Sequence, residues 1–82
     1  MANILDQIVR FVLEEHNGKG ENLTDGILGA DSSKDDLSMY YEKKETAERA
    51  AKLVIEKFGV YAVVLEQFAG PIRLFIYQAK EV

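Results

Sequence analysis

Residues 44–77 constrain this chain most, because the spacing of their apolar side chains changes twice. Two short apolar runs, at 60–65 and 72–77, are rich in branched and aromatic residues and are separated by a segment that contains Gly70 and Pro71. Runs of this length and composition favour strands. Before them, six apolar residues recur at helical spacing until Gly59 interrupts the pattern: Ala47, Ala50, Ala51, Val54, Ile55 and Phe58. The stretch therefore predicts a helix, with Thr46 as a candidate N-cap and Gly59 as its stop, followed by a β-hairpin.

A strand is predicted immediately before this helix, at 37–42. Leu37, Met39 and Tyr41 alternate there with more polar neighbours, as on a strand with one buried face. Strand, helix and strand in succession imply a parallel pair joined by a right-handed crossover. The resulting β-α-β-β order over 37–79 is the same as in half of a ferredoxin-like domain, where the third strand inserts between the first two. This is an analogy of topology.

The N-terminal part predicts one further helix and a connection. Residues 1–16 form an amphipathic pattern, with an apolar face made by Leu5, Ile8, Val9 and Val12. Residues 17–36 are acidic and rich in glycine. Within them, 26–30 could form an edge strand or a loose helical turn, and we expect the strand. The sequence thus predicts a single α+β domain over 1–82, with two helices and a three- or four-stranded mixed sheet.

Composition limits the class of protein further. The chain has 82 residues, no cysteine and a net charge of -4, which excludes disulfides and thiolate metal sites. Residues 1–36 hold eight acidic and three basic side chains, whereas 37–82 hold six and seven. No apolar run approaches the roughly 20 residues that span a bilayer, and the first residues lack the pattern of a signal peptide. We expect a cytoplasmic protein without a membrane partner.

No residue pattern carries catalytic, cofactor or metal chemistry. His16 is the one histidine, and no cysteine accompanies it. The glycines around Lys19 lack the spacing of a phosphate loop, and residues 31–36 lack the ligand order of a calcium-binding loop. We therefore predict no catalytic, cofactor-binding or metal-binding residue, no cofactor and no enzymatic activity.

The hairpin is apolar on both of its faces, and this is the feature that points to a function. If the second helix covers one face, the other presents an aromatic platform made by Tyr40, Arg73, Phe75 and Tyr77. Three outcomes are open at this stage. The first helix could cover the platform in an α/β/α sandwich, another protein or a second copy of the chain could bind there, or single-stranded nucleic acid could stack on it.

We predict that these four residues bind a protein partner. The chain would then be a non-enzymatic interaction module, a regulator or inhibitor that occupies another protein's surface. Small acidic proteins of this kind are often carried by phages and mobile elements, and such an origin is a hypothesis. Single-stranded nucleic acid is the alternative partner. It is less expected, because Lys43, Arg73 and Lys80 are few cations against a net negative chain.

Overall fold

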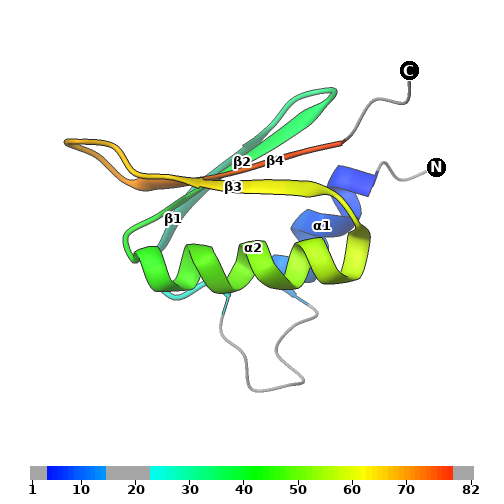
Figure 1. Ribbon diagram of the computed structural model, residues 1–82, viewed down its shortest axis with the longest axis horizontal. Coiled ribbons are helices and arrows are strands. Elements are labelled where there is room, and N and C mark those ends of the chain that lie inside the picture. Colours follow the sequence, from blue (N-terminus) through cyan, green and yellow to red (C-terminus); the bar gives the residue numbers. More distant parts are fainter. Residues whose placement is uncertain (1–3, 15–22, 79–82) are drawn as a thin grey trace.

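The computed structural model describes residues 4–14 and 23–78, and it contains one sheet with two helices on the same side (Figure 1). The predicted α+β fold class is confirmed. The elements, in chain order, are α1 (Ile4–Leu13), β1 (Ile27–Ser32), β2 (Asp36–Tyr41), α2 (Lys44–Phe58), β3 (Tyr61–Leu65) and β4 (Ile72–Tyr77). The connection predicted at 17–36 therefore contains a strand, as expected for 26–30, although this strand extends further toward β2. His16 and Lys80 lie outside the described residues.

The four strands lie in the order β1-β2-β4-β3, and every neighbouring pair is antiparallel. β4 thus inserts between β2 and β3, as the half-ferredoxin order predicts. The sheet is not mixed, contrary to the prediction, because every adjacent pair of the described strands is antiparallel. β2 and β3 do run in the same direction, but the β3–β4 hairpin folds back so that β4 separates them and pairs with both.

The core lies between this sheet and the two helices. Five strand side chains are fully buried in this core: Leu37, Met39 and Tyr41 of β2, and Leu74 and Ile76 of β4. From the helices, the buried side chains include Leu5, Ile8, Val12, Ala47, Ala50, Ala51 and Val54. The alanines of α2 are small, so this helix can lie close to the strands. An edge-to-face contact between Phe11 and Phe58, with ring centroids 5.6 Å apart, joins α1 to α2.

Two details of α2 differ from the prediction. Ile55 was expected in the buried stripe, but 43% of it is exposed, because it is rotated by about 100° from its buried neighbour Val54. Thr46 does not cap the helix. The N-cap is Lys43, which makes no side-chain capping bond, and Thr46 lies inside the first turn and is buried. The predicted stop is confirmed, since Gly59 has a left-handed φ of 68° and donates its N–H to the carbonyl of Ile55.

Candidate functional site

No described helix or strand covers the sheet face opposite the helices, and three rows of cross-strand neighbours form it. Read from β2 through β4 to β3, the rows are Asp36, Tyr77 and Tyr61; Ser38, Phe75 and Val63; and Tyr40, Arg73 and Leu65. On β1, Asp31 lies opposite Ser38 and Gly29 opposite Tyr40. Because successive side chains of a strand point to opposite faces, this face is fixed by the burial of Leu74 and Ile76 on the other. We call it the open face.

All four residues predicted as the partner-binding site lie on the open face. Tyr40 is directly opposite Arg73, and Phe75 and Tyr77 follow at alternate positions of β4. Each of the four is half-buried. The alternative in which the first helix covers them is wrong, because α1 packs beside α2 on the core face and contributes to the same cluster of buried residues (Figure 1).

The aromatic side chains of the open face contact one another. The rings of Tyr61 and Tyr77 stack with centroids 5.4 Å apart and an interplanar angle of 26°. Phe75 lies against Tyr77 at 5.4 Å, and the Arg73 guanidinium lies 4.9 Å from the centre of the Phe75 ring. These four side chains form a continuous aromatic cluster, in which the cation–π contact fixes the position of Arg73.

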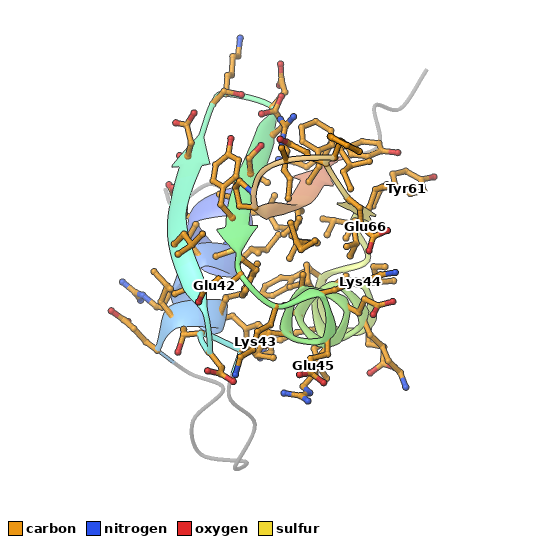
Figure 2. All side chains as sticks on the ribbon, turned by 90° about the vertical axis from the view of Figure 1, so that its left-hand side faces the viewer. Glu42, Lys43, Lys44, Glu45, Tyr61 and Glu66 are labelled. Atoms are coloured by element: carbon orange, nitrogen blue, oxygen red, sulfur yellow. The ribbon has the colours of Figure 1, made fainter. Side chains whose placement is uncertain are left out.

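Sequence analysis missed the contribution of β3. Tyr61, Val63 and Leu65 are 54%, 40% and 40% exposed, respectively, and Figure 2 shows Tyr61 pointing away from α2. Their alternation with Ala62 and Val64 could have indicated which residues share a face. The signal was weak because all five residues are apolar, so the two faces of the strand look alike in the sequence.

Arg73 is anchored on β2. Its Nε and Nη2 atoms donate to Ser38 Oγ at 3.0 and 2.8 Å, and Ser38 is buried beneath the guanidinium. A serine hydroxyl can accept both bonds. They hold the guanidinium of β4 against β2, so Arg73 is already ordered before a partner binds and loses less conformational entropy when it does.

Charge divides the open face into two halves. The β3 and β4 half is aromatic and apolar, with Arg73 as the one cation among the residues of the three rows. The β1 and β2 half carries Asp31 and Asp36, and Asp36 accepts a hydrogen bond of 2.9 Å from the Ser33 hydroxyl. The open face thus offers apolar contact on one side and a negative potential on the other.

The groups with shifted pKa values lie away from the open face. Burial in the core raises the pKa of Tyr41 well above its usual range, and its hydroxyl donates to the Leu23 carbonyl at 2.8 Å. A hydrogen bond to Asp25, 2.8 Å long, raises the pKa of Lys43, and a hydrogen bond to Glu66 raises that of Lys44. Within 4–14 and 23–78, no group of three or more His, Cys, Asp or Glu side chains could hold a metal ion.

In the part of the chain that the structure describes, neither helix has the length and apolar character needed to cross a membrane.

No known protein family, curated protein or solved structure matches the chain.

Proposed function

We propose that this chain is a non-enzymatic protein–protein interaction module that binds its partner through the open face. One observation carries the proposal: both helices cover the core face, while the opposite face presents the contacting side chains of Tyr61, Arg73, Phe75 and Tyr77. Tyrosine, phenylalanine and arginine are enriched at the centres of protein interfaces, where few residues supply most of the binding energy. A large exposed apolar patch marks such sites.

In this proposal the protein acts as a regulator or inhibitor, and its activity is the occupancy of the partner's surface. The acidic residues Asp31 and Asp36 beside the aromatic cluster favour a partner surface that carries apolar side chains next to basic ones. The cytoplasmic location and the phage or mobile-element origin stay predictions from the sequence.

Single-stranded nucleic acid is the second candidate, and the stacked pair of Tyr61 and Tyr77 is the observation that favours it, since bases stack on such rings. Phosphate binding argues against it. Arg73 is the one cation of the three rows, two of its N–H groups are bonded to Ser38, and the chain carries a net charge of -4.

The test is a capture experiment with a matched pair of double variants. Phe75→Ser with Tyr77→Thr removes two apolar side chains from the open face and keeps a residue of good β propensity at 77. Arg49→Ala with Lys52→Ala changes two exposed side chains of α2 instead. A protein that binds the wild type and the α2 variant, but not the open-face variant, supports the proposal. A protein that binds the open-face variant as well as it binds the wild type contradicts it.

A gel-shift titration with a single-stranded oligonucleotide separates the two candidates. We expect no shift at physiological salt. A shift that weakens steeply as salt is raised, and that the Phe75→Ser, Tyr77→Thr variant loses, would replace the protein partner with nucleic acid.

A further inference from the structure

The two edge strands of the sheet differ in how they are protected against pairing with another chain. β1 carries a bulge between Ile27 and Gly29, and it has a charged residue, Asp31, within the strand. Bulges and charges are devices by which proteins prevent edge-to-edge association. The β1 edge is therefore unsuited to pairing.

β3 has none of these devices. Its five residues, Tyr61–Leu65, include no charge, proline or glycine, and its register with β4 contains no bulge. Among the described strands, it pairs with β4 alone. Among the described residues, β3 makes no backbone–backbone hydrogen bond outside its pairing with β4. Such an edge presents a row of unpaired donors and acceptors to solvent.

The flank of α2 beside this edge is apolar in part. Lys44, Glu48 and Ile55 lie on about the same side of the helix, since they are separated by four and seven residues. Figure 2 shows Lys44 near Glu66, which follows β3, and their charged groups are 3.1 Å apart. This contact places the side of α2 that carries Lys44, Glu48 and Ile55 next to the β3 edge. The 43% exposed Ile55 therefore extends the apolar surface from β3 onto α2.

We propose that β3 pairs antiparallel with β3 of a second copy of this chain, about a two-fold axis at Val63, and so forms a continuous eight-stranded sheet. Only this register pairs all five strand residues. It places Tyr61 opposite Leu65 of the other copy and Val63 opposite itself, and such apolar cross-strand pairs stabilise a sheet. A two-fold axis is the commonest symmetry of protein dimers.

Charge favours a second copy as the occupant of this edge. The chain is acidic, with a net charge of -4, so two copies can associate only where like charges stay apart. β3 is uncharged, and on the flank of α2 beside it Lys44 interacts with both Glu66 and Glu48. The carboxylates of Asp31 and Asp36 belong to the β1–β2 hairpin at the far side of the sheet. Pairing through β3 puts these acidic hairpins at opposite ends of the dimer.

This dimer is independent of the proposed function, because pairing at the edge leaves the open face of each copy uncovered. The paired sheet would then present two aromatic clusters on one surface. A partner with two binding segments, or a symmetric partner, could engage both at once.

Sedimentation of charged variants tests the dimer. Val63 is 40% exposed, so Val63→Lys and Val63→Glu should each fold, which circular dichroism verifies. Each variant puts two like charges opposite one another at the axis, and we expect dimerisation to weaken roughly tenfold or more. An equimolar mixture of the two variants pairs lysine with glutamate and should restore the dimer. Val63→Thr, which adds no charge, is the matched control and should dimerise.

Three outcomes would overturn the proposal. A wild type that stays monomeric from micromolar to near-millimolar concentration excludes the dimer. If another protein binds this monomer, and Val63→Lys abolishes the binding while Phe75→Ser with Tyr77→Thr leaves it intact, the edge belongs to that protein instead. Variants that dimerise like the wild type would move the contact to another surface. Charged variants that stay monomeric when mixed would exclude the axis at Val63. The Phe75→Ser, Tyr77→Thr variant should still dimerise, which separates failure here from failure of the proposed function.

Discussion

Tyr41 combines a fully buried ring with a satisfied hydroxyl group. The ring lies in the core and its Oη donates to the Leu23 carbonyl at 2.8 Å. This bond ties residue 23, which is also buried and lies outside any helix or strand, to the core face of β2. A buried carbonyl that loses its donor becomes costly, because no water replaces the bond.

Tyr41→Phe should lower the free energy of unfolding at neutral pH by about 1–2 kcal/mol. The ring is kept, so the loss comes from the hydroxyl and from the Leu23 carbonyl that it leaves unpaired. Urea denaturation measures the difference. A stability equal to that of the wild type would show that the hydrogen bond contributes nothing to folding.

The same residue predicts a pH dependence. Burial raises the folded-state pKa of Tyr41 above its usual value of 10.0. Below pH 10 the hydroxyl is protonated in both states and stability does not depend on it. Above pH 10 the unfolded chain loses this proton first, so wild-type stability falls as pH rises. Tyr41→Phe cannot ionise, and we expect its stability deficit, measured by urea denaturation at pH 8 and pH 11, to shrink at the higher pH. A deficit that stays constant would contradict this.

At the scale of the elements, the most constrained junction is the one from α2 into β3. Gly59 adopts a φ of 68°, and no atom would lie within 4 Å of a β-carbon added there. Any cost of a side chain at this position is therefore conformational strain in the backbone, without a clash. The junction is short because Val60, which follows, is already buried and leads directly into β3.

Gly59→Ala should lower the free energy of unfolding by about 1 kcal/mol, since an L-residue is disfavoured in the left-handed region. Gly29→Ala is the matched control, because an added β-carbon would also meet no atom there and the backbone has no positive φ. Thermal unfolding of both variants makes the comparison. Equal melting temperatures for the two would contradict the role assigned to Gly59.

Most elements could be predicted from the sequence because their signals are local. The spacing of apolar residues placed α1, α2 and the β3–β4 hairpin, and Gly59 placed the end of α2. The capping role of Thr46 could not be decided in this way, since it depends on where the chain leaves β2 and begins the helix. The insertion of β4 between β2 and β3 came from the analogy of topology and not from a local signal, because it depends on pairing between β2 and β4, which are far apart in the sequence.

At the scale of the whole molecule, the open face was predictable in its residues but not in its exposure. Alternation along β4 places Arg73, Phe75 and Tyr77 on one side of the sheet, whatever the helices do. Whether α1 covers that side depends on the layer that the helix joins, and its amphipathic pattern fits either layer. The side chains of Leu5, Ile8 and Val12 are buried in the same core as those of α2, and Phe11 contacts Phe58 at the C-terminal end of α2. These contacts between distant residues place α1 on the core face, and no local pattern reveals them.

The central claim is that one face of β4 is core and the other is open, and unfolding of two double variants on the same strand tests it most directly. Phe75→Ser with Tyr77→Thr changes two half-buried side chains of the open face, at a cost of roughly 1–2 kcal/mol each. Leu74→Ser with Ile76→Thr changes two fully buried ones, at roughly 2–5 kcal/mol each. The total stability of such a domain is only about 5–10 kcal/mol.

Circular dichroism during thermal unfolding is the measurement. The account predicts that the open-face variant folds and melts cooperatively at a lowered temperature, whereas the core-face variant is unfolded or nearly so at room temperature. If the open-face variant unfolds as completely as the core-face variant, then part of the chain covers Phe75 and Tyr77, and the open face is not available to a partner.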